Sequence, residues 1–84
     1  MGQGIATHNL GLVSSKLGLI QEAISYYHKS LDLETEDLGR AITLNNIGHS
    51  LVLLENHTEA RQFIQQAMVI AVENDSAPLM AMAL

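Results

Sequence analysis

The sequence predicts an all-α protein built from two copies of an antiparallel helix–turn–helix unit. Two observations predict this fold class. The Asn-Leu-Gly of residues 9–11 returns as Asn-Ile-Gly at residues 46–48, and the Glu-Ala of residues 22–23 returns at residues 59–60, in both cases 37 positions later. Apolar residues also recur at the helical spacings of three and four. A fixed period of roughly 20 to 50 residues is typical of stacked repeat proteins.

Repeat one, residues 2–36, is expected to contain two helices. The first spans residues 5–17 and stops before Gly18, because glycine commonly follows the last residue of a helix. The second spans residues 19–33 and carries its apolar side chains on one stripe. Since only about two residues separate the helices, they are expected to fold back as an antiparallel hairpin.

Repeat two, residues 37–74, is expected to contain two more helices, with Asp37 as the N-cap of the helix at residues 38–54. Asn56, followed three positions later by Glu59, comes close to a capping box and predicts a helix at residues 57–73. Pro78 suits the first turn of a further helix at residues 77–84. The chain is therefore expected to be one domain, residues 1–84, that ends inside the first helix of a truncated third repeat.

The composition describes a folded chain that is not expected to bind nucleic acid. Hydrophobic residues make up 48% and charged residues 15% of the sequence. The net charge of −5 disfavours phosphate binding, which requires clustered Lys and Arg. No apolar stretch is long enough to span a membrane, and no secretory signal is recognisable. Without cysteine, nothing in the sequence needs an oxidising compartment, so the expected location is cytoplasmic.

Small residues recur where two helices of a hairpin would cross. Gly11 and Gly48 each lie inside an expected helix, where glycine costs about 1 kcal/mol relative to alanine. That cost is reasonable if a neighbouring helix must approach closely at this point. Ala23, Ala60 and Ala67 fit the same requirement.

These residues resemble the tetratricopeptide repeat family, whose units are helix–turn–helix pairs. The family pattern of a Leu-Gly pair, an alanine, an aromatic residue and a small residue is matched twice, by Leu10-Gly11, Ala23, Tyr27 and Ser30 and by Ile47-Gly48, Ala60, Ile64 and Ala67. The resemblance implies a short right-handed α-solenoid that serves as a scaffold for protein–protein interaction. The chain departs from the usual period of about 34 residues, lacks the early aromatic residue and has no proline closing either repeat. It looks more like the extended variant found in multi-domain bacterial regulators.

The resemblance also implies where a partner binds, because the first helix of each pair lines the concave face. That face would suit a peptide whose backbone is held by asparagine amides and whose apolar side chains rest on isoleucine and leucine. The alternative is that the asparagines only bond neighbouring helices. The family's lining positions correspond here to Ile5, His8, Asn9, Leu12, Lys16, Ile42, Asn45, Asn46, His49 and Leu53.

Some family members grip the C-terminal carboxylate of a partner with Lys and Asn at two of these lining positions. This chain has His8 and Leu12 at those positions in repeat one, and Asn45 and His49 in repeat two. The clamp is absent. We therefore expect no preference for acidic C-terminal tails.

Chemistry other than binding has little support in the sequence. The four histidines form no His-x-x-x-His pair and there is no cysteine, so no metal site is expected. A pH-sensitive groove through His8 and His49 is a second possibility, since imidazole titrates near neutrality. No nucleophile motif or glycine-rich phosphate loop is present, so we expect neither an enzyme nor a cofactor.

The apolar C-terminal stretch raises a different function. A lone first helix without its hairpin partner would expose apolar surface, and methionines adapt to irregular contacts. The leading interpretation is a protein-binding scaffold within a larger regulatory or signalling protein. The alternative is a structural module that forms a homodimer without an external ligand. The residues expected to mediate that contact are Leu79, Met80, Met82 and Leu84.

Overall fold

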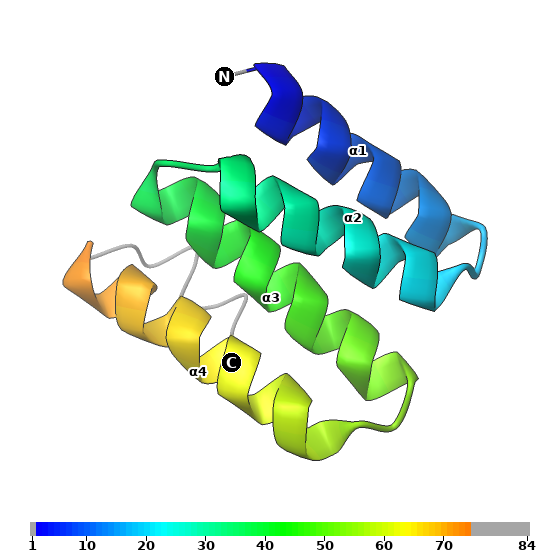
Figure 1. Cartoon of the computed structure of the whole chain (residues 1–84). Helices are drawn as coiled ribbons and strands as arrows, with labels where there is room; N and C mark the ends of the chain where they lie inside the picture. Colours follow the sequence, from blue (N-terminus) through cyan, green and yellow to red (C-terminus); the bar gives the residue numbers. More distant parts are fainter. Residues whose placement is uncertain (1, 75–84) are drawn as a thin grey trace.

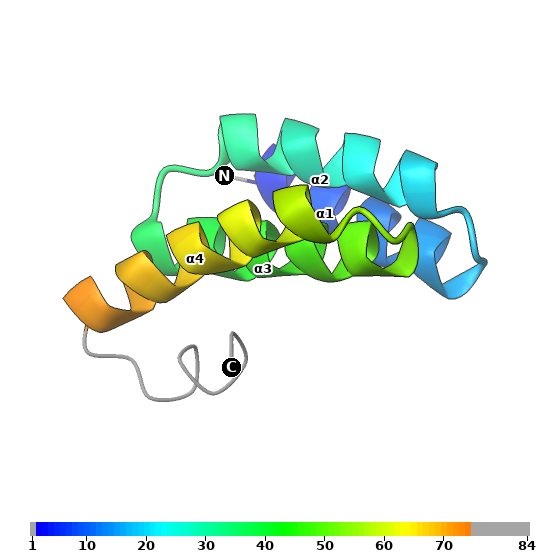
Figure 2. The same cartoon turned by 90° about the horizontal axis from the view of Figure 1, so that it is seen from below.

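A computed structural model describes residues 2–74 of the chain, with side chains from residue 6 onward. These residues form four α-helices, and Figure 1 shows them lying side by side in chain order. Figure 2 shows α2 on one side of the layer that α1 and α3 form. The all-α prediction is confirmed. The helices are α1 (Gly2–Lys16), α2 (Ile20–Leu33), α3 (Asp37–Leu53) and α4 (His57–Glu73).

The packing follows the two expected hairpins. Helix α1 packs on α2, α3 packs on α4, and α2 packs on α3 to join the two hairpins. The helix expected at residues 77–84 lies outside the described residues. None of the helices within residues 2–74 has the length and apolar content needed to cross a bilayer.

The helix starts differ from the sequence prediction in how they are capped. Asp37 is already the first residue of α3, and Glu36 occupies the N-cap position without a side-chain capping bond. The preceding turn is held instead by Glu34, whose Oε1 accepts the backbone N–H groups of Thr35 and Glu36 at 3.0 Å each. Asn56 does occupy the N-cap position of α4, but it makes no side-chain capping bond. Its ψ of 72° lies outside the extended conformation usual for a capping residue.

The core lies between the hairpins and is continuous from repeat one to repeat two. Tyr27 of α2 packs with Ile47 and Leu51 of α3 in one cluster that also contains Ala23 and Ala60. A second cluster joins Ala41, Leu44 and Ala67. Leu31 and Phe63 pack against both clusters, so the two repeats share one apolar interior.

The glycines expected at helix crossings do lie at close approaches. A Cβ added at Gly11 would lie 2.6 Å from Cε1 of Tyr27 on α2. A Cβ added at Gly48 would lie 2.5 Å from Cγ1 of Ile64 on α4. Both distances are well below a carbon–carbon contact of about 3.5 Å. The absence of a side chain at these two positions is what lets the paired helices approach.

Candidate functional site

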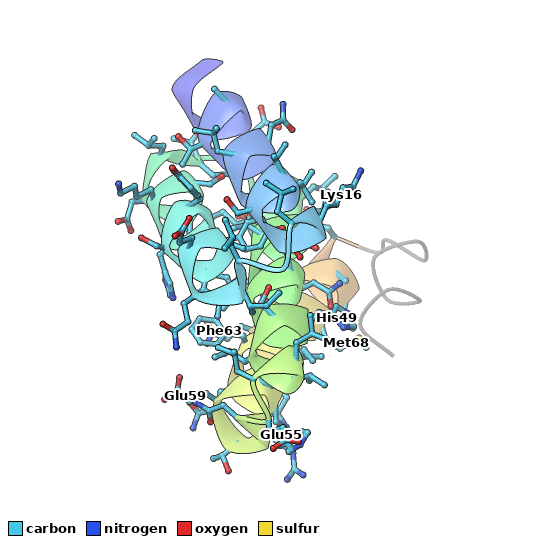
Figure 3. The ribbon with its side chains drawn as sticks, turned by 90° about the vertical axis from the view of Figure 1, so that its right-hand side faces the viewer. Lys16, His49, Glu55, Glu59, Phe63 and Met68 are labelled. Carbon is cyan, nitrogen blue, oxygen red and sulfur yellow. The ribbon has the colours of Figure 1, made fainter. Side chains whose placement is uncertain are left out.

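Five of the sequence-predicted lining residues reach the surface of α1 and α3. Asn9, Leu12 and Lys16 of α1 are exposed, as are His49 and Leu53 of α3. Figure 3 shows Lys16 and His49 on the same side of the ribbon. Ile42 is half-buried, and the side chain of Ile5 lies outside the described residues. We call the set Asn9, Leu12, Lys16, Ile42, His49 and Leu53 the α1–α3 face.

His8 lies where the two repeats meet. Its Nδ1 is 3.3 Å from the Thr43 hydroxyl, and its Nε2 is 3.4 Å from the amide nitrogen of Asn46. Its ring packs against Tyr27 with the centroids 5.5 Å apart. Because an amide nitrogen only donates, Nε2 accepts from Asn46 and the proton of a neutral imidazole sits on Nδ1, where it donates to Thr43. The half-buried His8 thus links α1 to α3.

Burial keeps His8 neutral. Desolvation lowers the pKa of His8 below its ordinary value of 6.5, and the carboxylate of Glu34 opposes this effect without reversing it. Protonation would make both ring nitrogens donors and would set Nε2 against the donating amide of Asn46. Burial likewise raises the pKa of Tyr27 above its ordinary value of 10.0. Both rings of this contact are therefore uncharged near neutral pH.

The free energy of unfolding is expected to fall as the pH is lowered from about 7.5 to about 5.5. The unfolded chain protonates His8 near its ordinary pKa, whereas the folded chain resists protonation until the pH is lower. The unfolded state then binds more protons, so stability is lost as the pH falls through this window. Thermal unfolding of the wild type and a His8→Gln variant at several pH values isolates the contribution of His8. If the stability of the two proteins depends on pH in the same way, His8 does not cause the pH dependence.

Two asparagines of the predicted groove serve the interior of the fold. The amide nitrogen of Asn46 donates to His8 of α1, so this asparagine bonds a neighbouring helix, as the alternative interpretation expected. Asn45 is only 4% exposed and its Oδ1 has no hydrogen-bond partner. Asn45 stands 37 residues after His8 and thus at the same position of its repeat. Neither His8 nor Asn45 presents a free polar group on the α1–α3 face.

A cavity that the sequence reasoning missed lies between α3 and α4. It has a volume of about 420 Å³, and its floor includes Leu44 and Ile70. The guanidinium of Arg40 lines it, but Nη1 of that group donates to the carbonyl oxygens of Leu31 at 3.0 Å and Glu34 at 3.4 Å. This bonding satisfies carbonyls at the end of α2, so Arg40 has a structural role. The remaining lining residues are Gln62, Gln65, Gln66 and Val69. The three glutamines recur at helical spacing on one face of α4, which is the sequence pattern from which this cavity could have been predicted.

The described part of the chain contains no candidate metal site. Within the described part of the chain, no three His, Cys, Asp or Glu side chains are placed to hold a metal ion. The residues expected to mediate self-association, Leu79, Met80, Met82 and Leu84, lie outside the described residues. Of the two surfaces predicted from the sequence, the α1–α3 face is therefore the one that the described residues include.

Comparison with known proteins agrees with this architecture. Residues 3–71 match the family model described as tetratricopeptide repeat. No curated protein and no solved structure gives a significant match to the sequence. The family match covers both hairpins and includes the paired glycines, the crossing alanines and the shared core. Proteins with such repeats generally mediate protein–protein interaction and are typically non-enzymatic. This chain, with its two stacked helical hairpins, belongs to the tetratricopeptide repeat family.

Proposed function

We propose that the chain is a scaffold that binds a segment of a partner protein on its α1–α3 face. The observation that carries this proposal is the exposure of two leucines on a face that also carries polar side chains. Leu12 is 37% exposed and Leu53 is 64% exposed. Exposed apolar side chains rimmed by polar ones are typical of protein interaction sites. First helices of stacked repeats commonly line such a surface.

The partner segment that fits this face has apolar side chains at intervals and a backbone open to hydrogen bonding. Leu12 and Leu53 offer apolar contact, while Asn9 and His49 offer donors and acceptors beside them. Lys16 is the one cation of the set. The proposed ligand is therefore an extended or helical peptide bound through two apolar anchors.

Replacing the two leucines of the face by aspartate is expected to weaken peptide binding by tenfold or more. Each leucine lost from an interface removes apolar burial worth about 1.5 kcal/mol or more. Peptides selected from a displayed random library provide the probe, and fluorescence anisotropy provides the affinity. The test variant combines Leu12→Asp with Leu53→Asp. Leu33→Asp, at a 46% exposed residue of α2 that belongs to neither proposed surface, is the matched control.

Two outcomes would contradict the proposal. Selected peptides that bind the Leu12→Asp, Leu53→Asp variant as tightly as the wild type would place the contact elsewhere. Enrichment of peptides with acidic C-terminal tails would contradict the expected absence of a carboxylate clamp. Circular dichroism of both variants confirms that a lost affinity is not a lost fold.

Self-association is the alternative function. The observation in its favour is that Val69 and Val72 of α4 are 55% and 58% exposed. In the sequence, residues 74–78 separate α4 from the apolar residues Leu79 and Met82. Sedimentation equilibrium of the same protein separates the two functions, because a scaffold alone stays monomeric over the concentrations at which the alternative requires a homodimer.

A further inference from the structure

The turns within the two hairpins, between α1 and α2 and between α3 and α4, lie at the same end of the molecule and form a second surface there. Figure 1 shows both turns, residues 17–19 and residues 54–56, on the right-hand side. A cavity of about 380 Å³ joins them, and Leu54 of repeat two lies in it with Leu19 and Ile20 of repeat one. The other lining residues are Gly18, Gln21 and Glu22. We call this the turn-end cavity. It contains no residue of the α1–α3 face.

The turn-end cavity has an apolar floor that the chain leaves open. Leu19 is 45% exposed and Leu54 is 40% exposed. Leu17, at the edge of the same turn, is 70% exposed. Adjacent exposed leucines around a cavity are the arrangement expected for a contact that a partner completes. A single leucine-sized side chain would contact residues of both repeats at once.

One glutamate lines this cavity, and a second is the sequence neighbour of a lining residue. Glu22 lines the cavity itself, and Glu55 follows Leu54 directly. Figure 3 shows Glu55 and Glu59 at one end of the ribbon, well away from Lys16. None of these three glutamates has an ion-pair partner within residues 6–74. Among the residues that line the cavity the single charged one is Glu22, and a basic partner segment is complementary to it.

The backbone at Glu55 gives an independent reason to connect the carboxylate with a function. Glu55 has a φ of 62°, in the left-handed region that residues with a Cβ rarely adopt. Gly18, with a φ of 81°, holds the corresponding position of repeat one, 37 residues earlier. Glycine adopts this conformation without a steric cost. A glutamate at the same position is therefore less favourable for folding than glycine, and strain of this kind is often found at functional positions.

We propose that the turn-end cavity binds a short basic segment of a partner protein. A leucine-sized side chain of that segment enters between Leu19, Ile20 and Leu54. Lysines or arginines beside it pair with Glu22 and Glu55. The binding surface is distinct from the α1–α3 face, and either surface can bind without the other.

A synthetic peptide tests the charge requirement. The probe is an acetylated and amidated octapeptide with two leucines flanked by lysines, and its matched control carries glutamates in place of the lysines. The lysine peptide is expected to bind with a Kd below about 1 mM, to shift the amide resonances of residues 18–22 and 54–55, and to bind less tightly as salt is added. No binding, or equal binding of the glutamate peptide, would overturn the proposal.

Variants test the residues of the cavity. Glu55→Gly is expected to raise Tm by a few degrees by relieving the positive φ, and to weaken binding of the lysine peptide about twofold to fivefold. Glu22→Gln should weaken binding by a similar factor, and Leu54→Asp should abolish the resonance shifts at residues 18–22. Glu73→Gln removes the same charge at the far end of α4 and should leave binding unchanged.

The result that contradicts the assignment is a Glu55→Gly variant that is stabilised yet binds the lysine peptide as tightly as the wild type. The Leu12→Asp variant should bind the lysine peptide normally. This comparison distinguishes failure of the turn-end cavity from failure of the α1–α3 face.

Discussion

Gly48→Leu is expected to lower the stability of the chain by about 3 kcal/mol, the upper end of the usual cost of overpacking. A Cβ at this position would lie 2.5 Å from Cγ1 of Ile64 and 3.2 Å from the backbone oxygen of Ala60. Because the oxygen of Ala60 is a backbone atom of α4 and cannot rotate aside as a side chain can, α4 must move away from α3. Domains have only roughly 0.05–0.15 kcal/mol of stability per residue, so this loss should lower Tm by about 10 °C or more in a thermal melt followed by circular dichroism.

Alanine at the same position separates steric clash from helix propensity. Alanine is the better helix former by about 1 kcal/mol, so Gly48→Ala would stabilise α3 if the space were open. We expect it to destabilise the chain instead. Ile64→Ala removes the closest side-chain atoms, so the double variant should be less unstable than the sum of the two single variants. A higher Tm for Gly48→Ala would show that α3 and α4 do not meet closely there.

Tyr27→Ala is expected to cost about 3–5 kcal/mol, the usual loss when a large buried aromatic side chain is removed. Tyr27 is 2% exposed, and its ring fills the space beside Gly11. It also packs against His8 and belongs to the cluster that contains Ile47. Its removal leaves a cavity at the junction of α1, α2 and α3, so both repeats should lose stability together in a chemical denaturation experiment.

Tyr27→Phe is the matched control because it keeps the ring and removes only the hydroxyl. We expect a change within about 1 kcal/mol. A large loss of stability in Tyr27→Phe would mean that the hydroxyl, and not the packing of the ring, stabilises the junction. A small loss in Tyr27→Ala would mean that the junction collapses around the missing side chain.

The repeat and its helices could be predicted because the signals are local. The near capping box of Asn56 and Glu59 predicted a helix over residues 57–73, and the structure has α4 at His57–Glu73. The caps at Asp37 and Asn56 were harder to predict. A capping bond depends on the φ and ψ of one residue, and here Glu34 organises the turn before α3. The type of residue at a cap position does not determine that geometry.

The candidate binding residues were predicted less completely than the helices. The lining positions that the family resemblance implied include Leu12, His49 and Leu53, which are exposed on α1 and α3. Those positions also include His8, which is half-buried, and Asn45, which is buried, at the same position of their repeats. Their burial depends on how the neighbouring helices pack, which no pattern within one helix records.

The sequence by itself determined the all-α class, because helix formation depends on neighbours three and four positions apart. It also determined the two hairpins, because a connection of only a few residues makes consecutive helices fold back on each other. The tertiary structure decided which first-helix residues stay exposed. It also brought Leu54 beside Leu19 to form the turn-end cavity. These contacts join residues far apart in the chain, so they follow from the packing of one repeat on the next.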